Sequence, residues 1–278
     1  MKWNWVFILV FSFHVAQAQS STELIASDMD ASVVSLISAG PGALSTNPAL
    51  AASVKSGLFG LYADNRFGLM ELNLIRISGV IPVLSGQSIA VHASRMGISE
   101  YQETGVDFSY ARKLSEMTAI GVSFGGEWYS KSKYERDLAI RSGLGLLIRW
   151  NRNSSFGFVI QNPWQTYFGR KYHEKSGLAF MLGYGYKPSD QIQLRADFKK
   201  EISNDWIMIF GASLSASSVL QWQYHFRSGS NTHQLGVVIQ RKKLSTRICF
   251  SYHNLLGLSG GSGIFNNIQQ DDLSMKRN

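Results

Sequence analysis

The sequence predicts an all-β fold: a transmembrane antiparallel β-barrel of about fourteen strands with a short helical plug at the N-terminus. Three observations lead to this prediction. Apolar residues alternate with small or polar ones over stretches of about 9–11 residues, the length of a strand that crosses a membrane. Short and long connections between these stretches alternate, as in bacterial outer-membrane barrels. After residue 18 no apolar run is long enough for a membrane-spanning helix, so a closed barrel is the remaining way to cross lipid.

The composition fits a strand-rich protein and excludes several other classes. Of the 278 residues, 45% are hydrophobic, which argues against disorder, and 17% are charged, fewer than the ~25% of an average soluble domain. The formal charge of +8 is spread along the chain without a basic patch. Nucleic acid is therefore not an expected partner, whereas outer-membrane lipid is. Cys249 is the single cysteine, which rules out an internal disulfide.

The first 56 residues divide into a leader and a segment unlike a barrel wall. Met1–Ala18 has the features of a secretory signal peptide: Lys2 near its start, an apolar stretch and an Ala16-Gln17-Ala18 cleavage site. We therefore expect an exported protein of the bacterial outer membrane. Its expected divisions are 1–18 as signal peptide, 19–56 as plug, 57–270 as barrel and 271–278 as a polar tail.

Asn47, Pro48 and Ala49 are the candidate plug residues. Asparagine is a favoured N-cap and proline suits the first helical position, so this sequence predicts a helix of one or two turns that begins at Pro48. Upstream, Ala31–Ile37 is apolar with helix-like spacing. Because the region lacks the alternation of a strand, we expect it to fold into the mouth of the barrel.

The alternation is clearest between Gly177 and Arg227, where it occurs three times. In Gly177–Tyr186, every second residue is leucine, phenylalanine or tyrosine, and those between are glycine, alanine or methionine. The whole pattern predicts strands near Leu58–Tyr62, Met70–Val80, Ser88–Met96, Glu103–Arg112, Met117–Tyr129, Leu138–Trp150, Ser155–Gln161, Gly177–Tyr186, Gln191–Lys199, Trp206–Leu214, Ser218–Arg227, Thr232–Gln240, Leu244–His253 and Gly263–Gln270. A soluble periplasmic β-sandwich would also alternate, but its apolar faces would form a core.

Three details of the wall follow from the same pattern. Short turns at one end contrast with two long outer loops, Tyr129–Asp137 and Asn162–Ser176. The alternation loses phase around Leu74–Ile75, which predicts a β-bulge. Gly257–Gly263 is rich in glycine but lacks the lysine and the following helix of a phosphate-binding loop. We interpret it as a plain connection before the closing strand Gly263–Gln270.

Four stretches resemble the FadL superfamily of outer-membrane proteins, and within it the PorV/PorQ-like group: Gly40–Ala52, Glu103–Lys113, Ile160–Pro163 and Ser251–Leu258. The resemblance implies a fourteen-stranded barrel whose N-terminal segment, with its Asn-Pro-Ala element, enters the lumen. It also implies one of two roles, either passage of small hydrophobic molecules or service to type IX protein secretion at the cell surface. The chain departs from the pattern at its end, where Phe265 is the last aromatic residue and a polar tail follows.

No catalytic, metal or cofactor site is predicted. The sequence lacks the G-x-S-x-G, H-E-x-x-H and P-loop motifs. A Ser/His/Asp set can be drawn from almost any chain with this many serines and histidines, so it carries no weight. We expect a protein that is not an enzyme.

Two sets of residues remain as functional candidates. The first lies in the longest predicted outer loop and would bind a partner or form an interfacial aromatic girdle: Trp164, Tyr167, Phe168 and Tyr172. The second falls on the inward faces of predicted strands and would set solute preference or form a paired internal network: Arg141, Arg149, Arg195, Asp197 and Arg227.

The leading functional hypothesis is a secretion- or surface-associated barrel that acts through protein partners of a secretion system. The alternative is a passive channel for small hydrophobic molecules. An apolar path beside Asn47–Leu50 would favour transport, and a large outer-loop surface would favour partners.

Overall fold

The computed structural model describes residues 32–34, 42–98, 100–131, 135–165, 167–168, 174–175, 177–202 and 205–266. The expected signal peptide (1–18), the polar tail (271–278) and Tyr172 lie outside these residues, as does most of Ala31–Ile37. Among the helices that are described, none is long and apolar enough to span a membrane.

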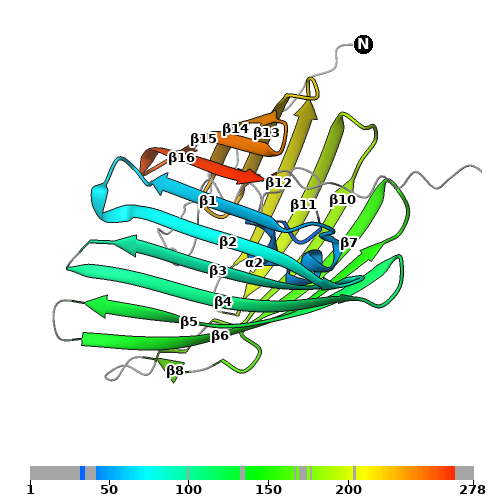
Figure 1. Ribbon diagram of the computed structural model, residues 1–278. Coiled ribbons are helices and arrows are strands. Elements are labelled where there is room, and N and C mark those ends of the chain that lie inside the picture. The colour runs from blue at the N-terminus through cyan, green and yellow to red at the C-terminus, as the bar shows by residue number, and fades with distance from the viewer. Residues whose placement is uncertain are drawn as a thin grey trace, which may run out of the picture.

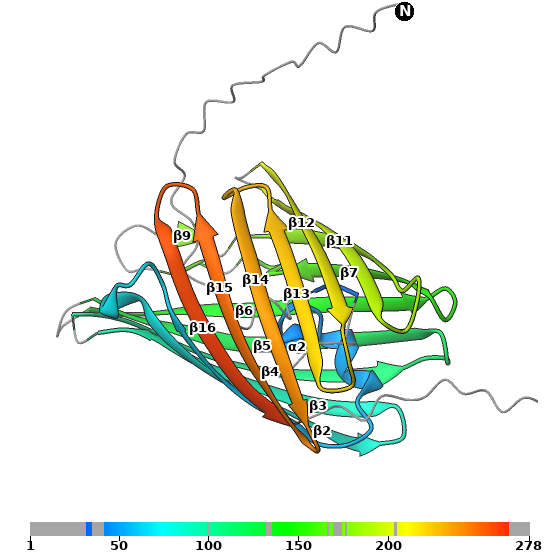
Figure 2. The same ribbon diagram turned by 90° about the horizontal axis from the view of Figure 1, so that it is seen from above.

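The chain forms a closed antiparallel barrel of fourteen strands (Figures 1 and 2). Each wall strand pairs with the next, and β16 pairs with β1 to close the circle. The wall consists of β1 (Leu58–Asn65), β2 (Asn73–Leu84), β3 (Gln87–Gly97), β4 (Tyr101–Lys113), β5 (Thr118–Lys131), β6 (Glu135–Arg149), β7 (Ser154–Gln161), β10 (Ala179–Tyr186), β11 (Ile192–Glu201), β12 (Trp206–Ser215), β13 (Leu220–Arg227), β14 (Thr232–Arg241), β15 (Leu244–His253) and β16 (Gly257–Asn266). The predicted fold class and strand number are confirmed.

Side chains of the wall alternate between an inner face and an apolar outer face. Along β10 buried and exposed residues alternate without a break, and Phe180, Leu182 and Tyr184 are 38–53% exposed. Phe108 on β4 and Phe124 on β5 are 56% and 62% exposed. Burying such surface is favourable by about 25 cal/mol per Å², so a belt of this kind belongs in lipid. The β-sandwich alternative is wrong, because these residues form the outer surface and not a core.

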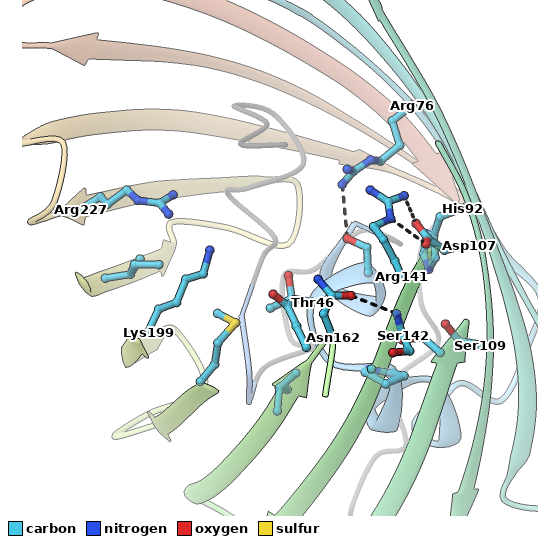
Figure 3. A pocket seen from close by; sticks show the side chains of 18 of the residues that line it. Thr46, Arg76, His92, Asp107, Ser109, Arg141, Ser142, Asn162, Lys199 and Arg227 are labelled. Carbon is cyan, nitrogen blue, oxygen red and sulfur yellow. Dashed lines mark hydrogen bonds and ion pairs between the residues drawn. The ribbon is translucent and has the colours of Figure 1, made fainter. Parts of the chain in front are cut away.

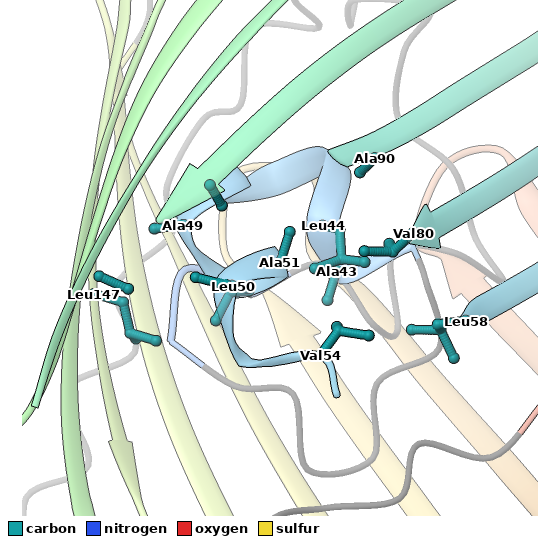
Figure 4. Close-up of a cluster of buried hydrophobic side chains, with 13 residues drawn as sticks. Ala43, Leu44, Ala49, Leu50, Ala51, Val54, Leu58, Val80, Ala90 and Leu147 are labelled. Atoms are coloured by element: carbon teal, nitrogen blue, oxygen red, sulfur yellow. The ribbon is translucent and has the colours of Figure 1, made fainter. Parts of the chain in front are cut away.

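Two short helices lie inside the barrel, α2 (Ala43–Thr46) and the 3-10 helix η1 (Pro48–Ser53) (Figure 2). η1 packs against the inner faces of β3, β4, β5 and β6. Figure 4 shows the cluster that results, in which Leu44 and Leu50 meet Leu58, Val80 and Leu147 of the wall. Each of the two helical leucines is 1% exposed, and burying one contributes about 1.5–3 kcal/mol. The helices are therefore anchored at the end of the barrel where β1 begins.

The predicted bulge at Leu74–Ile75 is wrong. Met70–Leu72 forms a short 3-10 turn, η2, and β2 begins only at Asn73, so the change of phase marks the start of a strand. From there β2 pairs with β1 without interruption. The register of β2 shifts at its other end, between Pro82 and Leu84, where proline lacks the N–H needed for the ladder.

The closing strand is Gly257–Asn266, so the strand is confirmed over Gly263–Asn266 but its predicted start is wrong, and the glycine-rich run belongs to the wall and not to a connection. Residues 267–270 lie outside the described residues. Glycine is needed here because the wall carries a large inward ring. A Cβ on Gly263 would lie 2.5 Å from Cδ1 of Tyr62, which is buried and stacks on Phe265 with ring centroids 6.2 Å apart.

The predicted outer loop Tyr129–Asp137 is also mostly wall, because β5 extends to Lys131 and β6 begins at Glu135. At the start of this region, the Tyr129 hydroxyl donates to Glu127 at 2.6 Å. The other predicted loop, Asn162–Ser176, is a long connection. It contains a separate two-stranded sheet of β8 (Tyr167–Phe168) and β9 (Glu174–Lys175).

Candidate functional site

Asn47 holds the internal helices through both ends of its side-chain amide. The side chain is fully buried, and its Oδ1 accepts from the backbone N–H of Ala49 at 3.0 Å. It thus caps η1, with Pro48 at the first helical position, as the sequence predicts. Its Nδ2 donates to the backbone carbonyls of Val33 at 2.6 Å and of Leu146 at 3.2 Å. One side chain therefore links the helix, the upstream segment 32–34 and strand β6.

The wall beneath Asn47 is made of glycine. Gly121 on β5 and Gly145 on β6 lie directly opposite each other. A Cβ on Gly145 would lie 2.2 Å from Oδ1 of Asn47, and one on Gly121 would lie 2.4 Å from the backbone nitrogen of Ala49. Side-chain carbons do not approach other atoms so closely, so this contact exists only because both positions are glycine.

Residues 32–34 rest on a second glycine pair. Gly157 on β7 lies opposite Gly183 on β10, and a Cβ on Gly157 would lie 2.2 Å from the carbonyl oxygen of Val33. The backbone N–H of Val33 also donates to Oδ1 of Asp197 at 3.4 Å, and Asp197 is 1% exposed. We call Gly121, Gly145, Gly157 and Gly183 the glycine seat. The alternation in the sequence places small residues between outward-facing apolar ones, but it does not indicate that a segment of the chain rests on them.

Arg141 is the centre of an ion-pair network across three strands. Its guanidinium donates to both oxygens of Asp107 at 2.7 and 3.2 Å, and its Nη1 lies 3.2 Å from Oε1 of Glu127. The three residues lie on β6, β4 and β5. A bidentate pair of this kind fixes the arginine and leaves little of the Asp107 charge uncompensated.

The other predicted lumen residues are distributed around the barrel. Arg149 donates to Oγ of Ser53 at 2.5 Å and so holds the end of η1. Arg195 contacts the ring nitrogens of His225 at 2.9 and 3.0 Å. Arg227 lines the cavity described next. The structure thus brings Arg141 and Arg227 to one cavity. Arg195 contacts His225, which also lines this cavity, whereas Arg149 and Asp197 contact Ser53 and Val33 of the N-terminal segment.

A cavity of about 250 Å³ lies in the lumen beside the internal helices (Figure 3). The helical segment contributes Ser45, Thr46 and Pro48. The charged residues of its lining are Arg76, Asp107, Arg141, Lys199 and Arg227, and its apolar part comes from Val159, Met181 and Ile209. Arg76 and Asp107 were not among the predicted lumen candidates. The alternation could have identified both as facing the lumen, because each lies between two apolar residues that face outward.

Three of the predicted outer-loop residues fall in described parts of the connection between β7 and β10. Trp164 is 71% exposed, and Tyr167 and Phe168 form β8. Trp164 is not among the described residues that line the cavity. Within the described parts of the chain, no group of three or more His, Cys, Asp or Glu residues could hold a metal ion.

No protein-family model matches the sequence, and no curated protein matches it significantly. Solved structures do match the fold. The Pseudomonas putida toluene transporter TodX superimposes with a TM-score of 0.62 at 10% identity, over 87% of this chain and 95% of TodX. The CymD monoaromatic hydrocarbon channel gives 0.56 at 12% identity, over 82% and 91% of the two chains. A Pseudomonas aeruginosa FadL homologue gives 0.54 at 10% identity, over 81% and 92%. The chain has a FadL-like barrel fold.

At these identities the similarity concerns the fold alone. The resemblance to FadL-type barrels inferred from the sequence is confirmed at this level, and the narrower PorV/PorQ-like assignment stays a prediction. A closed barrel of this fold with an apolar outer belt is a bacterial outer-membrane barrel surrounded by lipid, as the sequence predicts.

Proposed function

We propose that this protein is a passive outer-membrane channel for small, largely apolar molecules. The observation that carries the proposal is the cavity beside the internal helices, in a barrel whose fold is shared with a toluene transporter and a monoaromatic hydrocarbon channel. Val159, Met181 and Ile209 supply apolar surface to that cavity. The proposal includes no chemical step, and movement follows the concentration gradient of the solute.

The internal helices act as the plug in this proposal, and their attachment determines where a solute passes. η1 packs on β3 to β6, whereas the cavity lining also includes Lys199, Ile209 and Gln234 from β11, β12 and β14. We infer that the solute moves along this second side of the lumen. Asn47, Gly121 and Gly145 keep the plug on the first side.

Action through the partners of a secretion system, the leading hypothesis from the sequence, has less support. It requires a large outer-loop surface. At the end of the barrel opposite the plug, the connections are short apart from the one that contains β8 and β9. The transport alternative requires an apolar path beside Asn47–Leu50. The cavity reaches Pro48, and Val159, Met181 and Ile209 give it an apolar part, while most of its lining is polar or charged.

The proposal is tested by the uptake of radiolabelled toluene into Gram-negative cells that produce the barrel, compared with the same cells without it. We expect a higher initial rate in cells whose outer-membrane fraction contains the heat-modifiable, folded barrel. An equal rate in cells with and without the folded barrel would overturn the proposal.

A further inference from the structure

We propose that a row of polar wall residues in the lumen cavity binds the hydroxyl group of an uncharged solute, so that the channel takes single-ring alcohols or phenols. The polar row consists of Ser109 on β4, Ser123 on β5, Gly143 on β6 and Gln161 on β7, all of which line the cavity. This inference rests on the proposed channel function and specifies the class of solute.

The polar row crosses four adjacent strands at one level of the wall. Ser109 lies directly opposite Ser123 in the ladder, Ser123 lies opposite Gly143, and Gly143 lies opposite Gln161. Opposite residues of an antiparallel pair point to the same face, with their Cβ atoms about 4.5–5.5 Å apart. Two hydroxyl groups and one amide therefore stand in a line on the inner face, where one small solute can reach more than one of them.

Gly143 leaves space in the middle of the polar row. A Cβ at this position would lie 2.5 Å from Oγ of Ser123, which is shorter than the contacts of close-packed atoms. Any larger residue would therefore push the Ser123 hydroxyl aside. Because Gly143 has no side chain, a solute can lie over the backbone of β6, between the side chains of Ser123 and Gln161.

The polar row lies next to the plug. On β5 and β6 it stands two residues, about 7 Å, beyond Gly121 and Gly145, which carry the plug. Pro48 of the plug lines the same cavity. The polar row is thus the first line of wall residues beyond the plug on these two strands, where a solute that passes the plug meets the wall.

The next row of the wall carries charges that already bind each other. Asp107 and Arg141 stand two residues beyond Ser109 and Gly143, and the guanidinium donates to both oxygens of Asp107 at 2.7 and 3.2 Å. Figure 3 shows Ser109, Asp107 and Arg141 on the same side of the cavity. A charged solute would have to compete with this ion pair, whereas an uncharged hydroxyl would not. A hydroxyl group both donates and accepts, as do serine and glutamine side chains, so it matches the polar row.

The rest of the solute is expected to be small and apolar. A cavity of about 250 Å³ is smaller than the roughly 300–1,000 Å³ of sites for drug-sized ligands, so it suits a single ring. Val159, Met181 and Ile209 line the same cavity and offer apolar contact. A molecule of this size without a hydroxyl group would keep that contact, but it would displace water from the polar row without replacing the hydrogen bonds of that water.

The test compares phenol with toluene, in which a methyl group takes the place of the hydroxyl. Binding of each radiolabelled probe to the full purified barrel is measured by equilibrium dialysis in sealed cells, with the same detergent on both sides. The buffer is neutral, so phenol, like the tyrosine side chain, stays uncharged. Ser123→Ala is expected to weaken phenol binding roughly fivefold, the effect of one lost uncharged hydrogen bond, and to leave toluene binding unchanged.

Two further variants complete the test. Gln161→Leu changes the other end of the polar row and should weaken phenol binding by a similar factor, again without an effect on toluene. Ser262→Ala is the matched control, because it makes the same change as Ser123→Ala at an exposed position on the outer face of β16, between Ala63 and Ile248. An equal loss of phenol binding in Ser123→Ala and Ser262→Ala would contradict a specific site.

The hydroxyl site and the channel fail in different ways. If the ratio of phenol to toluene affinity is unchanged in both Ser123→Ala and Gln161→Leu, the hydroxyl site is refuted. Toluene uptake that depends on the barrel would in that case leave the channel proposal intact. Absence of such uptake would refute the channel itself.

Discussion

The glycine seat provides the sharpest prediction. In Gly145→Ala the new Cβ would lie 2.2 Å from Oδ1 of Asn47 and 2.9 Å from Cδ of Pro48, so the plug has to move. Moving the Asn47 amide removes the helix cap, which is typically worth about 1 kcal/mol, and two hydrogen bonds of about 1 kcal/mol each. We therefore expect the free energy that holds the plug in the lumen to fall by about 2–4 kcal/mol.

Thiol labelling measures this change. In a Cys249→Ala background, a single cysteine is placed at the fully buried Ala51 of the plug, and its reaction with a maleimide is followed in native outer membranes. Because labelling requires the plug to leave its place, the rate should rise roughly 30-fold or more in Gly145→Ala. Gly260→Ala is the matched control, since a Cβ at Gly260 would meet no atom within 4 Å. Equal labelling rates in two folded barrels, Gly145→Ala and Gly260→Ala, would refute the reasoning.

Three other predictions concern the network, the lipid belt and the cap. Arg141→Gln leaves the carboxylates of Asp107 and Glu127 without their cation and should lower the free energy of unfolding in lipid by about 3 kcal/mol. Adding Asp107→Asn should restore part of the lost stability. If it restores none, Arg141 and Asp107 are not energetically coupled. Leu182→Arg, on the outer face of β10, should cost about 2–4 kcal/mol in the same assay, and Leu114→Arg, in an exposed turn, at most about 1 kcal/mol. If the two cost the same, the outer face is not in lipid. In the labelling assay, Asn47→Ser keeps a capping oxygen but loses both donated bonds, so it should label more slowly than Asn47→Ala. The reverse order would show that the cap contributes little.

The wall was predictable from the sequence because membrane strands have a strict two-residue period. The alternation of Leu182 and Tyr184 with Gly183 and Gly185 indicates which side chains face lipid, and the structure places them so. The cap at Asn47 was predictable for a local reason, because an asparagine followed by proline specifies a helix start within a few residues.

The remaining features depend on contacts between distant segments. Position 263 of the closing strand requires glycine because the ring of Tyr62, on β1, occupies the space where a Cβ would lie. Asp197 faces the lumen as predicted, but its bond to Val33 depends on where the N-terminal segment crosses β10 and β11. The cavity collects Arg76 from β2 and Arg227 from β13, which only the closure of the barrel brings to one space. Alternation shows that a residue faces inward, but not what it meets there.

The most direct test of the channel compares two tryptophan variants at neighbouring positions of β14. Gln234 lines the cavity, and Leu235 is 61% exposed on the outer face. We predict that Gln234→Trp, which fills the cavity, abolishes most of the barrel-dependent toluene uptake, and that Leu235→Trp leaves it unchanged at equal amounts of folded barrel. Undiminished uptake in Gln234→Trp would show that solutes do not pass through this cavity and would contradict the account.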